Sequence, residues 1–318
     1  MKSLSERLAP YQTISIIGMA KNVGKTTTLN YLIDRFNQNK TRLALTSIGR
    51  DGESIDIVTK TEKPKIFIQQ GTVIATAEKL LGLCDITKEI LAVTDTNTPM
   101  GRVIIVRALS DGFVQLGGPS ITSQLHDLFQ CFAKLGVEKM IVDGALSRKT
   151  LANPSVTEAT ILCSGASLNP NIELVIKETQ HLIRLFTLPK LEDQAILSEL
   201  ESIKDEKVTK QKRYLYVRGA VSDAFVNQLI MSGAQLNGIY LIAEDASKIF
   251  VKPATYEKLM QKNGILTVIN PINLVGLTVN PTSPYEVNFD ANEFLEKIRR
   301  AIPVPVYDVM EGKQSCSS

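Results

Sequence analysis

One short segment of the chain places an apolar stretch, two glycines and a Lys-Thr pair in an order that suits phosphate binding. The segment covers residues 13–33, with Gly18 and Gly24 bracketing a loop and Lys25-Thr26 following it. Glycines let such a loop aim successive backbone N–H groups inward, and a helix beginning after it directs partial positive charge at an anion. A lysine here reaches the β- and γ-phosphates of a nucleotide, and the next hydroxyl ligates Mg²⁺. The sequence therefore predicts a nucleoside triphosphate site with ATP and Mg²⁺ as cofactors.

The positions between and after the two glycines complete this predicted site. Five residues separate Gly18 from Gly24, one more than in the usual pattern. The predicted nucleotide-binding residues are Gly18, Lys21, Asn22, Val23, Gly24, Lys25, Thr26 and Thr27. We expect Thr27 to face the α-phosphate and Thr28 to be an ordinary helix residue. Lys21 is ambiguous, because it can either reach phosphate or point to solvent.

Acidic residues at strand ends are expected to hold the metal ion. Asp143 ends an apolar strand, and Asp51 follows the second predicted strand. The carboxyl ends of parallel strands share one edge of a sheet, so both acids are expected beside the phosphate loop. The predicted catalytic residues are Lys25, Asp51 and Asp143, and the predicted metal ligands are Thr26, Asp51 and Asp143. Asn280, at the end of a later strand, is a weaker candidate for contacting a purine edge.

Composition excludes several classes of function. The 318 residues are 44% hydrophobic and 22% charged, which is typical of a globular protein. The net charge of +3, from 36 basic and 33 acidic residues, is too small to indicate a nucleic-acid partner. Four widely spaced cysteines and two histidines indicate neither a zinc site nor a disulfide framework. Because no apolar run approaches 18 residues, we expect no membrane association and a cytoplasmic location.

The order of the predicted elements indicates an α/β fold. We expect a mainly parallel sheet in a P-loop nucleotide-binding domain over residues 1–190, a charged helix and linker over 191–212, and a smaller C-terminal α/β domain over 213–318. Within the first domain, the patterns predict a helix over residues 73–81 and a hairpin that joins residues 102–108 to 113–116.

The loop itself resembles that of known enzymes. Residues 18–26 resemble the phosphate loop of dethiobiotin synthetase and of the cobyric and cobyrinic acid synthases, which also place five residues between the glycines. The resemblance implies magnesium-binding acids that match Asp51 and Asp143. Two features differ: Ala20 stands where the related cell-division ATPases carry a signature lysine, and no Gly-Gly follows the Asp143-Gly144 pair.

A wider set of segments is similar to a second family. Residues 15–30, 45–53 and 141–147 look like a bacterial family associated with adenosylcobalamin-dependent lysine 5,6-aminomutase and proposed to reactivate that enzyme. This resemblance implies an ATPase with a cobalamin-dependent aminomutase as its protein partner. The chain lacks the Asp-x-His-x-x-Gly pattern that ligates cobalamin, so it is not expected to bind that cofactor in this way.

Three functions remain open from the sequence. The first is a Mg²⁺-dependent P-loop ATPase that acts as an accessory or reactivating factor for a partner enzyme. The second is an ATP-dependent synthetase that activates a small carboxylic acid, and the third is a nucleotide-binding module without hydrolysis. A homodimer and the choice between ATP and GTP also remain open.

Overall fold

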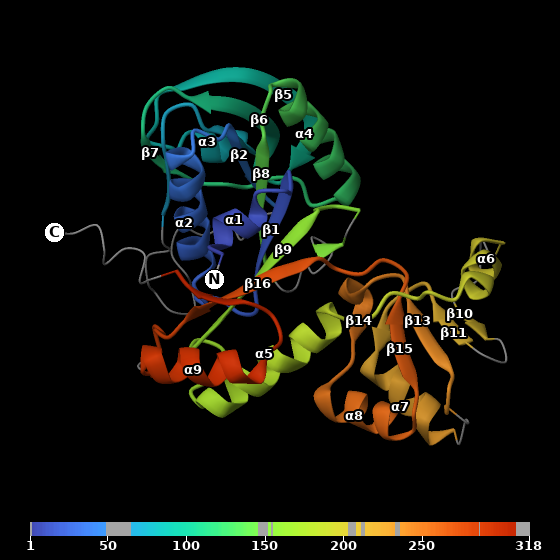
Figure 1. The fold of residues 1–318 in the computed structure, drawn as a ribbon. Coiled ribbons are helices and arrows are strands. Elements are labelled where there is room, and N and C mark those ends of the chain that lie inside the picture. Colours follow the sequence, from blue (N-terminus) through green and yellow to red (C-terminus); the bar gives the residue numbers. More distant parts are fainter. Residues whose placement is uncertain are drawn as a thin grey trace. The chain divides into compact units, whose positions relative to one another are not determined.

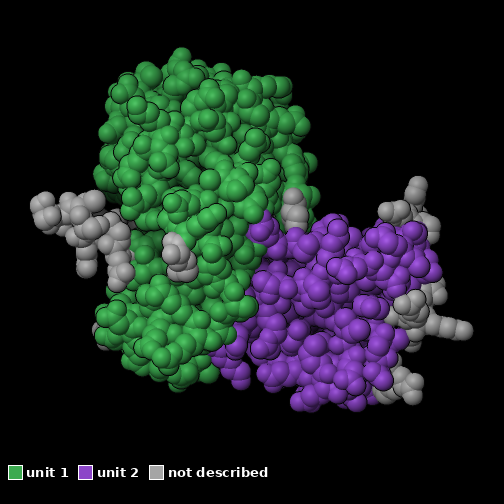
Figure 2. All heavy atoms as spheres, viewed as in Figure 1, with its two compact units in different colours: residues 1–176, 274–318 green, residues 177–273 purple. Residues whose placement is uncertain are grey.

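The computed structural model describes residues 2–48, 65–145, 152–153, 155–202, 208–210, 214–232, 236–285 and 287–309. The chain divides into two compact units, residues 1–176 with 274–318 and residues 177–273 (Figure 2). The second unit is therefore an insertion in the sequence of the first.

The first unit is built on a nine-stranded sheet in the order β17-β16-β9-β1-β8-β2-β4-β6-β5. Neighbouring strands from β17 to β4 are parallel, whereas β6 is antiparallel to both β4 and β5. A short antiparallel pair, β3 with β7, lies apart from this sheet. The strands are β1 (Thr13–Gly18), β2 (Leu43–Ser47), β3 (Ile66–Ile68), β4 (Val73–Ala77), β5 (Lys88–Thr98), β6 (Gly101–Ala108), β7 (Gly112–Val114), β8 (Lys139–Ala145), β9 (Ala159–Gly165), β16 (Leu274–Asn280) and β17 (Val306–Asp308).

Strand β1 lies inside this sheet, between β8 and β9, and is buried on both faces (Figure 1). Ile14 and Ile16 belong to a large apolar cluster with Leu29 and Leu32 of α2. Ile17 is also buried but faces the other way, since side chains alternate along a strand. Burial on both faces is typical of a parallel sheet covered by helices. The helices of this unit are α1 (Leu4–Leu8), α2 (Lys25–Gln38), α3 (Glu78–Leu81), α4 (Thr122–Lys134), α5 (Ile172–Phe186), which continues into the second unit, and α9 (Ala291–Ala301).

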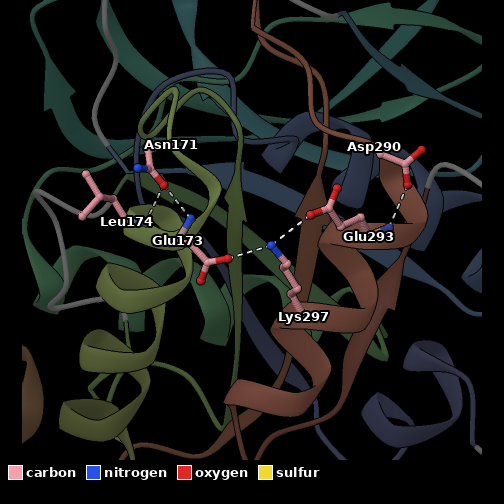
Figure 3. A network of polar contacts seen from close by, with 6 residues as sticks. All are labelled: Asn171, Glu173, Leu174, Asp290, Glu293 and Lys297. Carbon is pink, nitrogen blue, oxygen red and sulfur yellow. Dashed lines mark hydrogen bonds and ion pairs between the residues drawn. The ribbon is translucent and has the colours of Figure 1, made fainter.

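Polar contacts fix the starts of α5 and α9 and connect the two helices (Figure 3). Asn171 accepts a hydrogen bond from the Glu173 N–H at 2.9 Å, and Asp290 accepts one from the Glu293 N–H at 2.8 Å, so each helix has a side-chain cap. Lys297 Nζ lies 2.7 Å from Glu173 Oε1 and 2.9 Å from Glu293 Oε1. Hydrogen bonds to both carboxylates raise the pKa of Lys297. The lysine thus joins α9 to α5.

The second unit has its own four-stranded sheet, in the order β10-β11-β13-β15. Strands β11, β13 and β15 are parallel, and β10 is antiparallel to β11. A separate core of Leu191, Ile196, Tyr214 and Ile242, among others, holds the unit together. Tyr214 donates a hydrogen bond to Glu199 at 2.8 Å. Its elements are α6 (Gln194–Ser202), β10 (Val208–Lys210), β11 (Tyr214–Val217), β12 (Val221–Ser222), α7 (Asp223–Met231), β13 (Tyr240–Ala243), β14 (Ile249–Phe250), α8 (Pro253–Gln261) and β15 (Ile265–Val268).

The observed division of the chain differs from the sequence-based domains. An α/β fold with a mainly parallel sheet is confirmed. However, β16 and β17 extend the sheet of the first unit through the pairs β9–β16 and β16–β17. The segment after residue 273 therefore belongs to the first unit and not to a C-terminal domain over residues 213–318. Strand β16 is assigned to the first unit by its pairing partner β9, about 115 residues earlier in the chain, and not by a feature of its own sequence.

Two local predictions are wrong. Residues 73–81 are not one helix: β4 covers Val73–Ala77, and only Glu78–Leu81 is helical. The β-branched and small residues of β4 are fully buried between β2 and β6, which favours a strand. The predicted hairpin also fails, because β6 pairs with β4 and β5 while β7 pairs with β3. Among the described residues, no helix combines the length and apolar character needed to cross a membrane.

Candidate functional site

The predicted phosphate loop lies at the carboxyl end of β1 and turns directly into α2. Gly24 is the N-cap of α2 and has a φ of 86°. A Cβ on this residue would lie 2.9 Å from Cβ of Asn280, so a side chain has neither a favourable conformation nor room. Asn22 also adopts a left-handed conformation, with a φ of 60°. The sequence-based strand, loop and helix are confirmed at this position.

Backbone donors collect where the loop joins the helix. The first helical hydrogen bond is donated by the Thr28 N–H to the Gly24 carbonyl at 2.9 Å. The N–H groups of Lys25, Thr26 and Thr27 come before this bond and have no carbonyl one turn earlier within the helix. Such a set of donors, together with the helix dipole, stabilises an anion. The arrangement therefore suits a phosphate group.

The structure brings Lys25 and Asp143 together. The parallel pairing of β1 with β8 sets Ile16 opposite Asp143, so Asp143 lies near the end of β8 at the edge that carries the loop. Lys25 Nζ lies 2.9 Å from Asp143 Oδ1, and the two side chains are 26% and 17% exposed. The distance between the two atoms is that of an ion pair, but the geometry at Oδ1 is not that of a hydrogen bond. A lysine and a strand-end carboxylate from the two predicted motifs are therefore adjacent.

The other predicted residues of the site differ in their exposure to solvent. Thr26 and Thr27 are partly exposed in the first turn of α2, as are Gly24 and Asn22 in the loop, while Gly18 and Val23 are buried. Lys21 is exposed. Asp51 lies outside the described residues, so its predicted catalytic and metal-binding roles remain predictions.

Oxygen ligands are the chemistry that Mg²⁺ prefers. In the part of the chain that the structure describes, no group of three His, Cys, Asp or Glu side chains could hold a metal ion. The Thr26 hydroxyl and the Asp143 carboxylate are nevertheless suitable oxygen donors at the loop. They fit an ion bound jointly by a few protein oxygens and by the phosphates of a nucleotide, which is the usual mode for Mg²⁺.

A buried polar cluster supports the loop and was missed by the sequence analysis. Thr28, expected to be an ordinary helix residue, is fully buried and donates a hydrogen bond to the Gly24 carbonyl at 3.1 Å. Its Oγ1 lies 2.8 Å from Oγ1 of Thr278 on β16, and Thr278 donates to Cys163 Sγ on β9 at 3.1 Å. Strands β9 and β16 and helix α2 thus meet beneath the loop. The signal in the sequence was a polar residue within each apolar strand. Its role could be inferred only once the pairing of β9 with β16 was known.

The Cys163 thiol predicts a pH dependence of stability. Burial raises the pKa of this thiol from 9.0 to about 11, although its hydrogen bonds with Thr278 and Thr28 oppose the change. The unfolded chain therefore loses this proton above pH 9, while the folded protein keeps it until about pH 11. The stabilisation is complete below pH 9 and decreases as the pH rises through about 11.

We expect the free energy of unfolding to fall more steeply above pH 9 in the wild type than in Cys163→Ala. The difference in slope should approach ~1.4 kcal/mol per pH unit. Urea unfolding at pH 8, 9 and 10 measures it for both proteins. The alanine variant has a constant cost from its cavity, which does not change with pH. Parallel pH curves for the two proteins would show that the thiol is not protected by the fold.

Comparisons with known proteins add little to this geometry. No model of a protein family matches the chain, and no curated protein matches it. Among solved structures, the crystal structure of signal recognition particle receptor FtsY from Elizabethkingia anophelis is similar, with a TM-score of 0.30 and 12% identity over 90% of this chain. The chain spans 65% of the length of that receptor chain. A similarity this distant supports no functional conclusion.

Proposed function

We propose that the first unit is a Mg²⁺-dependent nucleoside triphosphatase that holds ATP on the loop between β1 and α2. The observation that carries the proposal is the 2.9 Å pair of Lys25 with Asp143 beside a loop whose helix begins with backbone donors that have no carbonyl partner within the helix. A lysine, a strand-end acid and a helix N-terminus together provide the charges that phosphoryl transfer requires.

Each residue has a separate role in the proposed reaction. The N–H groups from Val23 to Thr27 bind phosphate oxygens, and Lys25 adds a positive charge at the β- and γ-phosphates. Lys25 must exchange Asp143 for phosphate when the nucleotide binds, which releases the carboxylate. Thr26 and Asp143 are then the protein ligands for Mg²⁺, whose chemistry is to neutralise phosphate charge. Asp51 is proposed as the second acid, which orients water or binds the metal.

We further propose that hydrolysis serves a partner enzyme. The support is the sequence resemblance to the family associated with lysine 5,6-aminomutase, so an inactivated cobalamin-dependent aminomutase is the partner to test. Hydrolysis would change the conformation of loops that contact this partner, as in other nucleotide switches. A switch of this kind is slow on its own.

Stimulation by the partner tests this second step. We expect ATP hydrolysis by the full chain to rise at least tenfold when inactivated aminomutase is added, and to stay at the basal rate with an unrelated enzyme. Equal rates under both conditions would contradict the partner proposal. Turnover that instead depends on a small carboxylic acid, without any protein partner, would indicate the synthetase reaction.

A further inference from the structure

Two side chains from distant parts of the chain hold one carbonyl group of the phosphate loop. The Asn22 carbonyl accepts a hydrogen bond from Ser167 Oγ at 3.1 Å and another from Asn280 Nδ2 at 3.1 Å. Ser167 lies just after β9, and Asn280 is the last residue of β16. Asn22 is left-handed, with a φ of 60°, a conformation that costs energy and persists only where the surroundings hold it.

The orientation of Asn280 is determined by its other contacts. Its Oδ1 accepts hydrogen bonds from the Thr282 N–H at 3.1 Å and from Thr282 Oγ1 at 2.8 Å. Because the oxygen is engaged by two donors, the amide nitrogen must face Asn22. The backbone of Asn280 is also fixed, since its carbonyl accepts from the Ala166 N–H at 2.9 Å. The donor to the loop is therefore held in place from both sides.

Fixing the Asn22 carbonyl also fixes the next N–H group. In a trans peptide the C=O and the N–H point in opposite directions, and the structure has no cis peptide bond among the described residues. The Val23 N–H therefore points away from Ser167 and Asn280. Val23 is 1% exposed, and its N–H has no acceptor among the residues that the structure describes. A buried donor of this kind needs a partner, and a phosphate oxygen is one.

We propose that Ser167 and Asn280 are positioning residues that hold the Asn22–Val23 peptide so that the Val23 N–H faces a bound phosphate. This inference rests on the proposed function and goes beyond it, because neither residue needs to touch the nucleotide. It also differs from the sequence-based hypothesis that Asn280 contacts a purine edge. A positioning role affects every ligand that carries the phosphates, whereas a base contact affects only nucleotides.

Binding measurements with three ligands separate these roles. The substitution Asn280→Asp keeps the size of the side chain and its acceptors but removes the donor to Asn22. We expect it to weaken ATP, GTP and inorganic tripolyphosphate alike, each about fivefold, as for loss of one hydrogen bond. The matched control is Asn288→Asp, which adds the same charge in the loop that follows β16. Asn288 is exposed, and its side-chain oxygen accepts a hydrogen bond from the Ser283 N–H at 2.9 Å.

A second variant keeps the test independent of how Asn280→Asp folds. Ser167→Ala removes the other donor, and we expect it to weaken all three ligands about threefold while the melting temperature stays within a few degrees of the wild type. Unchanged tripolyphosphate affinity in both variants would overturn the inference, and an altered ATP-to-GTP ratio would then assign Asn280 to the base. If wild type and Lys25→Ala bind none of the three ligands, the proposed function itself is wrong.

Discussion

The substitution Lys25→Ala should reduce ATP hydrolysis at least a hundredfold and weaken ATP binding between about 10- and 150-fold. The expected loss of affinity is about 1.5–3 kcal/mol, because a charge-assisted contact to phosphate is removed. Hydrolysis falls further, since the negative charge of the reacting phosphate group is no longer balanced. Isothermal titration measures the affinity, and phosphate release measures the rate.

A lysine elsewhere on the first unit controls for loss of charge. Lys134 is exposed in the last turn of α4, which leads toward the start of β8 and so lies away from the carboxyl edge of the sheet. Lys134→Ala should bind and hydrolyse ATP as the wild type does. Should Lys25→Ala retain full affinity while remaining folded by circular dichroism, the assignment of the loop would be wrong.

The substitution Asp143→Asn should separate binding from hydrolysis. Asparagine keeps the shape of the side chain but removes the charge that attracts Mg²⁺ and pairs with Lys25. We expect hydrolysis to fall about a hundredfold or more, because stabilisation by the metal is worth several kcal/mol. Affinity for ATP without Mg²⁺ should be equal to or higher than in the wild type, since Lys25 no longer has a competing partner.

The informative quantity is the effect of Mg²⁺ on affinity. In the wild type, Mg²⁺ should strengthen ATP binding, and in Asp143→Asn this gain should be largely lost. Asp127→Asn, an exposed position on α4, is the control for an equal change in charge and should behave as the wild type. An equal gain from Mg²⁺ in Asp143→Asn and the wild type would exclude Asp143 as a metal ligand.

The sequence predicted the parts of the fold that depend on local pattern. Strand β1 and helix α2 lie where the pattern of residues 13–33 placed them, and β2 and β8 are the strands expected before Asp51 and at Asp143. The errors concern pairing between distant segments. Nothing within residues 274–280 indicates that β16 pairs with β9 rather than with the strand just before it. Periodicity also cannot separate a short buried strand such as β4 from a helix.

The residues of the candidate site also divide into those that a local motif predicts and those that depend on pairing between distant strands. Lys25 and Asp143 were predicted because each belongs to a recognisable local motif, and the parallel register then makes them neighbours. Thr278, Ser167 and Asn280 support the loop through contacts that span more than 100 residues of sequence. Their roles depend on which strands flank β1, which the sequence did not reveal. Local motifs thus identified Lys25 and Asp143, and the fold supplied the residues that hold the loop in shape.

The most direct test of the central claim is a titration of the wild-type chain with ATP, with and without Mg²⁺, set beside the same titration of Lys25→Ala. We predict saturable binding that Mg²⁺ strengthens in the wild type and that Lys25→Ala weakens at least tenfold. Binding that is absent, or that is the same in both proteins, would contradict a triphosphate site on this loop.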